Sequence, residues 1–344
     1  MNDTGAADLA VIVVSWKDAR ELYEAVASLA AARAAAGSGS RISLTIVVNG
    51  ETDVRPEEIL GCWPGATVVF NRENRGFGPA ANQGATGTDA AALLFLNPDT
   101  RAEEDSFREL LRGFRAHPEA VALAPRLLDL AGVADPSPSS RLAPPGREDQ
   151  FTFQLRRLPT LASDARELLL VDHLFPNNPG RRRVRYAELD RGTPFEVEQA
   201  AGAALAVRTE AFRRLGGFAE EFTPAWFEDV DLCARLAPMG KVLYWPAARF
   251  RHRGGASAEH LGYSRFLPVY YRNALRYRRR HYGVLAQAAY RVLLVKGMLL
   301  RLAVLPWRRS DPRPKGESAR AYLGVLRVAL GFASGTPDRG AARS

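Results

Sequence analysis

The chain has 344 residues, which exceeds one typical domain and is enough for one large α/β domain with an appendage. Its 47% hydrophobic content supports a sizeable core, and its two cysteines, Cys62 and Cys233, exclude a disulfide framework and have no metal-ligand spacing. This cysteine usage suits a reducing, cytoplasmic setting. The first residues include Asp3 and Asp8 and lack a basic segment, so we expect no signal peptide.

The net charge of +9 is placed mainly in one segment. Between Arg265 and Lys315 there are thirteen Lys or Arg residues and one acid, Asp311, a balance of +12, so the rest of the chain carries 9 − 12 = −3. A segment of this kind can meet an anionic membrane or nucleic acid. Because no nucleic-acid-binding module accompanies the charge, we expect no nucleic-acid partner.

Strands and helices alternate through the first part of the chain. The apolar run LAVIVVS at 9–15 predicts a strand buried on both faces, and the Ala-rich segment 18–36 predicts a helix. Further strands are expected at 42–48, 67–70, 91–96, 121–124 and 241–245, and further helices at 78–86, 103–116 and 208–215. This alternation predicts parallel β-α-β units, and hence an α/β protein with a Rossmann-like, mostly parallel sheet and helices on both faces.

The middle and the end of the chain are less regular. Residues 136–146, PSPSSRLAPPG, predict a loop, and we interpret about 136–196 as a variable, partly helical insertion. From residue 263 the sequence becomes basic and aromatic. We therefore predict one domain over 1–262 and a basic helical region over 263–344 whose tail end is disordered.

Ligands of such sheets bind beyond the carboxyl ends of the strands. Polar or glycine-rich residues follow four of the predicted strands directly: Ser15-Trp16, Asn49-Gly50, residues 71–78 and Asn97-Pro98-Asp99. Each is ordinary as a turn, but four in succession predict a ligand site. The segment NRENRGFG at 71–78 offers backbone N–H groups and Arg75, which could cradle phosphate. Asp99 could bind a hard divalent cation or simply cap the next helix.

The segment 226–236, WFEDVDLCARL, holds Glu228, Asp229 and Asp231 within four residues. A helix starting at Asp229 would bury two leucines on one face and place the acids at its N-terminus, where the helix dipole favours negative charge. By itself this pattern predicts only a well-capped amphipathic helix. His252, in RFRHRGG, could bind a borderline ion such as Mn²⁺ or could be a surface residue.

Taken in order, these segments resemble family 2 glycosyltransferases with the GT-A fold, most closely the rhamnosyltransferase-like branch. The resemblance spans about residues 9–260 and rests on VIVVSW, VVNG, NRENRGFGPAANQG, LFLNPDT, GAALAVRTEAFRRLGGFAEEF, WFEDVDLCARL and RFRHRGGAS. It implies an inverting transferase dependent on Mg²⁺ or Mn²⁺. Such an enzyme moves a sugar from a nucleotide-diphosphate sugar donor to a glycan or polyprenyl-linked acceptor in cell-surface polysaccharide biosynthesis.

The resemblance also implies roles for individual residues. Asp99 matches the metal-binding carboxylate of the family's D-x-D element, and His252 matches a histidine that completes the metal site in some members. Asp229 matches the proposed general base. The residues assigned to the nucleotide-sugar side include two from the possible phosphate cradle at 71–78. The full set is Ser15, Trp16, Asn49, Arg75, Gly76 and Asn97. Those assigned to the acceptor side are Trp226, Glu228 and Asp231, the two acids having helix capping as their alternative role.

Two positions depart from the family pattern. Lys17 stands where the family usually has Asn after the aromatic residue, and Val48 replaces the first Asp of the usual V-D-N-G-S element. Val48 cannot make the contact by which the family's Asp helps to select the nucleotide base. The sequence therefore does not distinguish a uridine donor from a deoxythymidine donor. Rhamnose as the transferred sugar is an analogy with the branch.

The region after residue 263 alternates tyrosines with arginines and then becomes apolar over 284–307, interrupted mainly by Arg291, Lys296 and Arg301. Each cation at the centre of a membrane helix costs about 2.5–3.5 kcal/mol, so we expect no spanning helix. The cations are five apart and spread around a helix, which leaves packing on the enzyme body open. We expect a basic surface on the anionic inner leaflet, where each cation contributes about 1 kcal/mol. A solvated basic face is the alternative.

Two other functions fit part of the same pattern. A nucleotidyltransferase of related fold would need a Gly-rich activation loop after the first strand, and SWKDAREL lacks the glycines. A catalytically silent, membrane-associated adaptor would have no need of the acids and His252 together. We therefore predict a hexosyltransferase that is cytoplasmic and peripheral on the inner face of the cell membrane.

Overall fold

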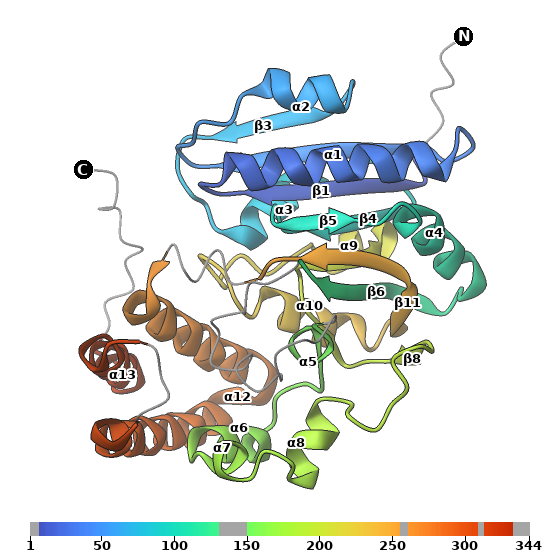
Figure 1. The fold of residues 1–344 in the computed structure, drawn as a ribbon. Helices are drawn as coiled ribbons and strands as arrows, with labels where there is room; N and C mark the ends of the chain where they lie inside the picture. Colours follow the sequence, from blue (N-terminus) through green and yellow to red (C-terminus); the bar gives the residue numbers. More distant parts are fainter. Residues whose placement is uncertain (1–6, 131–149, 255–260, 309–312, 333–344) are drawn as a thin grey trace. The chain divides into compact units, whose positions relative to one another are not determined.

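A computed structural model of the chain describes residues 7–130, 150–254, 261–308 and 313–332. It divides into two compact units, drawn in Figure 1. The sheet unit comprises Met1–Leu158 and Pro179–Ser257, and the helical unit comprises Pro159–Asn178 and Ala258–Ser344. The predicted loop at 136–146 and the predicted disordered tail end, beyond residue 332, lie outside the described residues.

The sheet unit is built on one nine-stranded sheet with the order β3-β2-β1-β4-β10-β6-β11-β5, to which β8 adds by pairing with β11. Its strands are β1 (Leu9–Ser15), β2 (Ile42–Asn49), β3 (Thr67–Asn71), β4 (Ala92–Leu96), β5 (Thr100–Ala102), β6 (Ala120–Asp129), β8 (Phe195–Glu196), β10 (Ala204–Arg208) and β11 (Lys241–His252). Strands β1, β2, β3, β4, β6 and β11 run in one direction, and β5, β8 and β10 run against them. The predicted mostly parallel sheet is confirmed.

Helices cover both faces of this sheet, as predicted (Figure 1). Alternate residues of β1 point to opposite faces, so Val11 and Val13 enter one core and Ile12 enters the other. The first core is completed by α1 (Ala19–Ala36), α2 (Pro56–Cys62) and α4 (Ser106–Ala116). The second is completed by α3 (Phe77–Ala85), α9 (Thr209–Arg214) and α10 (Glu228–Leu236). Shorter elements of the sheet unit are α5 (Phe151–Gln154), β7 (Leu155–Arg156), α8 (Pro179–Val184) and β9 (Gln199–Ala200).

The last long strand, β11, is the clearest departure from the predicted elements. The sequence predicts a strand only over 241–245, because Pro246 interrupts the apolar run. In the structure the strand continues past a register shift between Trp245 and Arg249 and ends at His252. There His252 lies opposite Thr100 of β5. This extension brings His252 beside the turn that holds Asp99.

The helical unit contains α6 (Leu161–Leu168), α7 (Val171–Leu174), α12 (Tyr263–Val304), the 3-10 helix η2 (Leu305–Trp307) and α13 (Lys315–Ala329). Gly283 has φ +82°, a value that suits glycine, and it divides α12 into two helical halves. The buried Arg278 guanidinium of the first half donates to the Asp164 carboxylate of α6. This ion pair, together with the hydrogen bonds from Arg301 to the carbonyls of Glu167 and Leu168, joins Pro159–Asn178, inside the predicted insertion, to the C-terminal helices.

None of the described helices combines the length and the apolar character needed to cross a bilayer.

Candidate functional site

The carboxyl ends of β1, β2 and β4 lie side by side in the sheet, because β1 pairs with both of the others in parallel. They carry Ser15, Asn49 and, one residue beyond β4, Asn97. Ser15 is buried, whereas Trp16, the next residue, is half-buried and has the Lys17 ammonium 5.0 Å from its ring centroid. The structure thus brings these predicted residues to one edge of the sheet.

Asn49 organises the loop that follows β3. Its side-chain oxygen accepts from Asn71 Nδ2 and from the Arg75 N–H, each at 3.1 Å. Its amide nitrogen donates to Asn74 Oδ1 at 2.9 Å and to the Gly76 carbonyl at 3.1 Å. Asn49 is buried, so these bonds fix the loop from beneath and leave the Arg75 side chain exposed.

Gly76 is the point where this loop meets the segment before α10. Its φ is +92°, and a Cβ there would lie 2.7 Å from Thr223 Cγ2 and 2.9 Å from the Pro224 carbonyl oxygen. The next residue, Phe77, donates its N–H to the same Pro224 oxygen at 2.7 Å. A side chain at position 76 would therefore separate two segments that the sequence places almost 150 residues apart.

Asp99 and His252 form the second cluster. Both are buried, and His252 Nε2 lies 3.3 Å from Asp99 Oδ1. The Arg253 N–H donates to the Asp99 carbonyl at 3.1 Å, which holds the end of β11 against the turn. Burial acts to raise the pKa of Asp99, but His252, a backbone hydrogen bond and the positive charge of Arg101 together outweigh this effect, and the pKa lies below its usual value. Asp99 is therefore ionised at neutral pH.

Asp229 lies in the first turn of α10, as predicted, and the helix begins one residue earlier at Glu228. Asp229 Oδ2 accepts from the Gly202 N–H at 2.9 Å, and its Oδ1 accepts from the Val230 N–H at 2.8 Å. Burial raises the pKa of Asp229, although these two hydrogen bonds oppose the shift. The side chain is half-buried, so it can still meet a ligand at the surface of the site.

Two adjacent residues connect Asp229 to the Asp99 turn. While Gly202 donates to Asp229, the Ala203 carbonyl accepts from the Asn97 N–H at 3.1 Å and from Thr100 Oγ1 at 3.3 Å. A Cβ at position 202 would lie 3.4 Å from the Asp229 Cβ, so the small residue permits this close approach. The structure therefore places the predicted base and the predicted metal carboxylate around one short segment.

The remaining acids of the predicted cluster differ in their surroundings. Glu228 is buried, its Oε2 has no hydrogen-bond partner, and burial followed by the Asp229 charge raises its pKa well above the usual value. Asp231 is fully buried and pairs with Arg235 Nε at 2.7 Å, and that arginine also donates to the carbonyls of Leu215 and Gly217. Arg235, held by Asp231, therefore fastens α10 to the turn at Leu215 and Gly217. Trp226, predicted on the acceptor side, is half-buried with φ +73°.

The sequence did not single out three residues that the structure places at this site. Gly202 holds Asp229, and Gln150 contacts His252 Nδ1 through its Oε1 at 2.7 Å. Arg156, in β7, contributes a positive charge that favours the ionised form of Asp229. The small-residue run around Gly202 was visible in the sequence, but nothing in the sequence links Gln150 or Arg156 to their partners.

Asp99 and His252 offer one carboxylate oxygen and one imidazole nitrogen to a metal ion. His252 Nε2 is buried and has no hydrogen-bond partner, which is what a ligand atom awaiting an ion would show. This donor pair fits a borderline ion such as Mn²⁺, provided that other ligands complete the coordination. Among the described residues no group of three or more His, Cys, Asp or Glu side chains forms a complete metal site.

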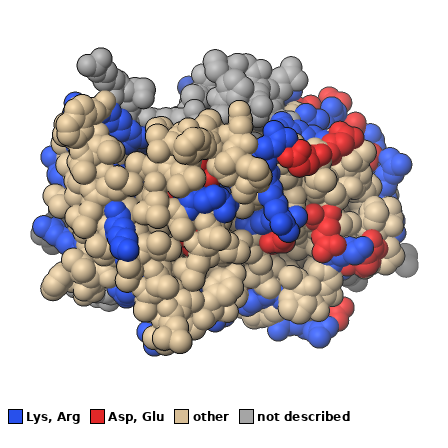
Figure 2. Space-filling model, turned by 90° about the horizontal axis from the view of Figure 1, so that it is seen from below, with Lys and Arg blue, Asp and Glu red and all other residues tan. Residues whose placement is uncertain are grey.

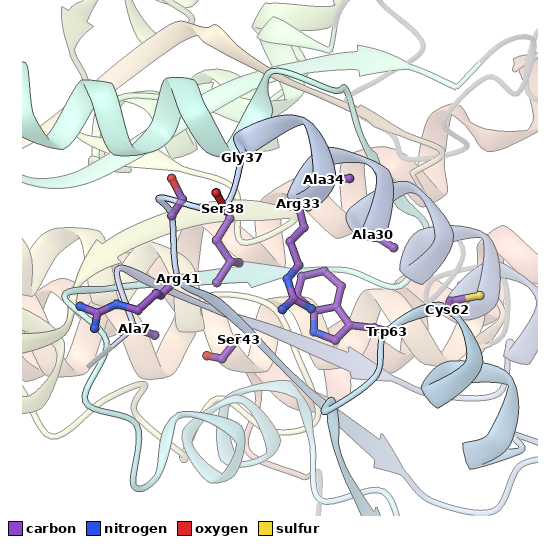
Figure 3. A pocket seen from close by; sticks show the side chains of 12 residues that line it. Ala7, Ala30, Arg33, Ala34, Gly37, Ser38, Arg41, Ser43, Cys62 and Trp63 are labelled. Atoms are coloured by element: carbon purple, nitrogen blue, oxygen red, sulfur yellow. The ribbon is translucent and has the colours of Figure 1, made fainter. Parts of the chain in front are cut away.

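A cavity of about 590 Å³ lies elsewhere, beside the amino ends of β1 and β2 (Figure 3). It is lined by Arg33 and Trp63, which stack with the guanidinium 4.7 Å from the ring centroid, and by Cys62 and Ser38. None of the predicted site residues lines it. Because ligands of parallel sheets bind at the carboxyl ends of the strands, this cavity is not part of the candidate site.

Comparisons with known proteins identify the family and the fold of the chain. A family model described as glycosyl transferase family 2 matches residues 10–185. Two curated relatives, both N-acetylglucosaminyl-diphospho-decaprenol L-rhamnosyltransferases from strains of Mycobacterium tuberculosis, are 28% identical over 258 residues, which is 71% of this chain and 75% of each relative. The mannosyltransferase PcManGT from Pyrobaculum calidifontis, solved in complex with GDP-Man and Mn²⁺, shares the fold with a TM-score of 0.52 at 14% identity, covering 95% of this chain and 87% of that chain.

Proposed function

The chain belongs to glycosyl transferase family 2, and we propose that it is an inverting, metal-dependent enzyme acting on a nucleotide-diphosphate sugar. Its acceptor is a glycan or a polyprenyl-linked glycan of cell-surface polysaccharide biosynthesis. One observation carries the proposal: Gly202 and Ala203 join the Asp229 carboxylate to the turn that holds Asp99. The two halves of a displacement reaction, leaving-group side and acceptor side, thereby lie at one site.

The donor nucleotide lies along the carboxyl ends of β1, β2 and β4. Ser15 and the half-buried Trp16 contact the base and ribose, and Asn49 acts by holding the loop that carries Arg75 and Gly76. The exposed Arg75 guanidinium meets the diphosphate, because a planar cation can pair with two phosphate oxygens at once. Asn97 lies beside the diphosphate, because it directly follows β4 and precedes Asp99 by two residues.

Asp99 and His252 would hold the divalent ion, Mg²⁺ or Mn²⁺. The bound ion neutralises negative charge that develops on the leaving diphosphate. On the protein's side, the lowered pKa of Asp99 keeps this ligand ionised at neutral pH, and burial excludes competing water. The family match and the Mn²⁺ in the PcManGT complex support this proposal.

Asp229 is the general base. As the acceptor oxygen attacks the anomeric carbon, its proton moves to the Asp229 carboxylate. A bond forms from the acceptor oxygen to that carbon while the bond from the carbon to the diphosphate oxygen breaks. Because the base and the leaving diphosphate lie on opposite sides of the sugar, the anomeric configuration inverts. A positioned carboxylate of this kind contributes about 10²–10⁴-fold to the rate.

The relatives support a finer description of the substrates. Their name states an L-rhamnosyl transfer to N-acetylglucosaminyl-diphospho-decaprenol. We infer that this chain uses a lipid-linked diphosphate sugar of the same chemical class, with rhamnose as the first sugar to test. Such an acceptor would place the enzyme on the cytoplasmic face of the cell membrane, with the basic C-terminal region facing anionic lipid.

Thermal-shift screening of nucleotide sugars tests the donor assignment, because a ligand of the native state raises the melting temperature by mass action. We expect stabilisation by one nucleotide-sugar class, and only with Mg²⁺ or Mn²⁺ present. Asp99→Asn should abolish the metal dependence. Stabilisation by nucleoside triphosphates alone would favour the nucleotidyltransferase alternative, and no stabilisation by any nucleotide would favour the adaptor.

A further inference from the structure

Three polar residues in the second half of α12 bond other parts of the helical unit. Gln287 donates to the Leu275 carbonyl at 3.1 Å. Arg291 donates to the carbonyls of Val328 and Ala329, at 3.3 and 2.6 Å, where α13 ends. Arg301 donates to the carbonyls of Glu167 and Leu168, where α6 ends. Cations stabilise the carbonyl ends of helices, so these side chains fasten the helices together.

The opposite side of the same half-helix carries apolar side chains. Leu285, Val292 and Leu299 follow at seven-residue intervals and are 86%, 54% and 53% exposed. Residues at this spacing share one face of a helix, and we call these three the outer stripe. Val284 precedes the stripe and Trp307, which is 77% exposed, follows it. The exposed side of this half-helix is therefore mainly apolar, with Lys296 among its exposed residues, whereas the inward side combines the hydrogen-bonded polar side chains with the buried Tyr290, Leu294 and Met298.

This exposure is a property of the helical unit rather than of the whole surface. Sixteen of the described large hydrophobic residues are exposed, and thirteen of them belong to the helical unit. The sheet unit, which contains most of the described chain, has only Leu60, Phe70 and Leu189 among those sixteen. Concentrated apolar surface of this kind marks an interaction site.

The charge around the stripe indicates what covers it. Residues 263–332 contain fifteen Lys or Arg and two acids, Asp311 and Glu317. Lys296 is exposed and lies between Val292 and Leu299 along the helix, and Arg279, Arg320 and Arg327 are exposed as well. Figure 2 shows isolated Lys and Arg side chains in a mostly uncharged surface over α12 and α13. A second copy would meet this face with like charge, whereas anionic lipid headgroups would be attracted to it.

We propose that the outer stripe docks into the boundary between headgroups and acyl chains of an anionic phospholipid bilayer. The second half of α12, about 30 Å long, lies flat on the membrane. Leu285, Val292 and Leu299 enter the apolar layer, and the Lys296 ammonium extends to lipid phosphate. The inference rests on the proposed function, in which the acceptor is lipid-linked, and it names the surface that brings the enzyme to that acceptor.

Vesicle co-sedimentation of the full chain tests the docking. The variant Leu285→Gln/Leu299→Gln removes apolar character without changing charge, and Leu60→Gln/Leu189→Gln is its control, because those two leucines are exposed in the sheet unit. We expect wild type and control to bind vesicles of phosphatidylcholine with phosphatidylglycerol. The stripe variant should bind these vesicles more weakly by a factor of at least about ten. Brominated lipid should quench the part of the tryptophan fluorescence that Trp307→Phe removes.

Equal vesicle binding by wild type and stripe variant would overturn the proposal. So would a wild-type dimer that the stripe substitutions dissociate, since the stripe would then cover a second copy. Donor binding separates this inference from the proposed function. If wild type binds vesicles through the stripe but no nucleotide sugar stabilises it, the docking stands and the proposed function fails; the reverse result overturns the docking alone.

A second inference concerns Gln150, whose side chain contacts His252 from behind. Gln150 Nε2 donates to Asp129 Oδ1 and to the His252 carbonyl, both at 2.7 Å. Both partners can only accept, so the amide nitrogen must face them and the amide oxygen must face His252 Nδ1, at 2.7 Å. Nδ1 therefore carries the proton. In the neutral ring Nε2 is then an unprotonated acceptor, 3.3 Å from Asp99 Oδ1.

We infer that Gln150 is a positioning residue that selects the His252 tautomer able to bind a metal ion together with Asp99. The Phe153 ring stacks on the imidazole at 5.9 Å between centroids and holds its plane. Partners of this kind commonly change metal affinity by about 10–100-fold. The inference is independent of the membrane surface and concerns only residues of the sheet unit.

Nitrogen NMR of the histidine rings reads the tautomer without any metal, with His252→Asn identifying the signal. We expect Nδ1 protonated and Nε2 bare in wild type, and a mixture in Gln150→Met, whose Mn²⁺ affinity should fall about 10–100-fold by calorimetry. Gln154→Met is the matched control, because Gln154, at the end of α5, is likewise buried but bonds the Pro125 carbonyl and the Leu127 N–H instead of His252. An Nε2-protonated ring in wild type, or unchanged Mn²⁺ affinity in Gln150→Met, would overturn the inference.

Discussion

The sheet unit and the helical unit use buried charge in different ways. In the sheet unit the buried Asp99 and His252 face one another without a hydrogen bond at Nε2, and Glu228 keeps an unpartnered Oε2. In the helical unit the buried Arg278 donates to Asp164 and packs over the Tyr290 ring, 4.8 Å from its centroid. Burial alone therefore does not identify a catalytic group. An unpartnered buried atom does not do so by itself either, because Arg278 Nη1 in the helical unit is one; the informative sign is a buried acceptor without a donor at the carboxyl edge of the sheet, beside Asp99.

The largest expected effect comes from the base in the sheet unit. Asp229→Asn should lower kcat by about 10²–10⁴-fold, because the amide cannot accept the acceptor's proton. Donor binding should be unchanged, since Asp229 lies on the acceptor side. Steady-state turnover and donor calorimetry on the same preparation check both statements. Near-normal turnover with intact donor binding would remove Asp229 from the mechanism.

The corresponding change in the helical unit should affect stability instead. Arg278→Met leaves the Asp164 carboxylate buried without its partner and should destabilise the helical unit by about 3–5 kcal/mol. Burial already raises the pKa of Asp164 to about 6, with Arg278 opposing the shift. The destabilisation should therefore shrink below pH 6, where the carboxyl group is neutral, and grow above it.

Hydrogen exchange of residues 263–304 at pH 5 and pH 8 measures this difference. The double variant Arg278→Met/Asp164→Leu should recover most of the loss, because no charge is left buried. Donor binding should be unchanged in Arg278→Met at temperatures where the chain stays folded. A loss of donor binding there would contradict the assignment of donor binding to the sheet unit alone.

The elements that the sequence predicted are those with a local signal. The run LAVIVVS matches β1 at both ends, and α1 begins directly after Asp18, the first residue of the predicted helix, whose side chain accepts from the Glu21 N–H. The short strands β5 and β8 were missed, because two or three residues carry no period. The longer strand β10, inside the apolar run GAALAV, was not predicted as a strand either. The strand β11 was predicted only as far as Trp245, since the bulge that restores its pairing depends on β6 and not on its own residues.

The candidate site was predictable as a set of residues but not as a geometry. Asp229 and Asp231 are two positions apart and chemically alike, yet Asp231 pairs with Arg235 while Asp229 meets Gly202. Their partners lie in other segments, so no local pattern separates them. In the C-terminal region the five-residue spacing of the cations predicted no single polar face of the helix. The structure shows that Arg291 and Arg301 bond the carbonyl ends of other helices, and these partners could not be predicted from the spacing.

The pH dependence of the reaction is a smaller effect and again belongs to the sheet unit. Burial raises the pKa of Asp229 above that of an ordinary aspartate, which is about 3.9. As the pH falls, Asp229 should therefore become protonated, and the enzyme should lose activity, at a higher pH than an ordinary aspartate would allow. Activity is therefore full above the raised pKa and lost below it. A profile of kcat/KM against pH, at saturating metal, checks the midpoint. A midpoint at or below the ordinary value would contradict the assignment.

The smallest effect is expected at the neighbour of the base. Burial raises the pKa of Glu228 well above its usual value, which favours the neutral acid. Glu228→Gln replaces that acid with a neutral group of the same shape and should keep kcat within about threefold. Turnover of the two amide variants, measured side by side, decides between the acids. A loss as large as that of Asp229→Asn would make Glu228 the base.

The most direct test of the reaction mechanism is the anomeric configuration of the product. NMR of the glycosidic linkage formed from the donor identified by thermal shift should show a configuration opposite to that of the donor. One base at Asp229, facing the leaving diphosphate across the sugar, predicts this inversion. A product with the donor's own configuration would contradict the single-displacement mechanism.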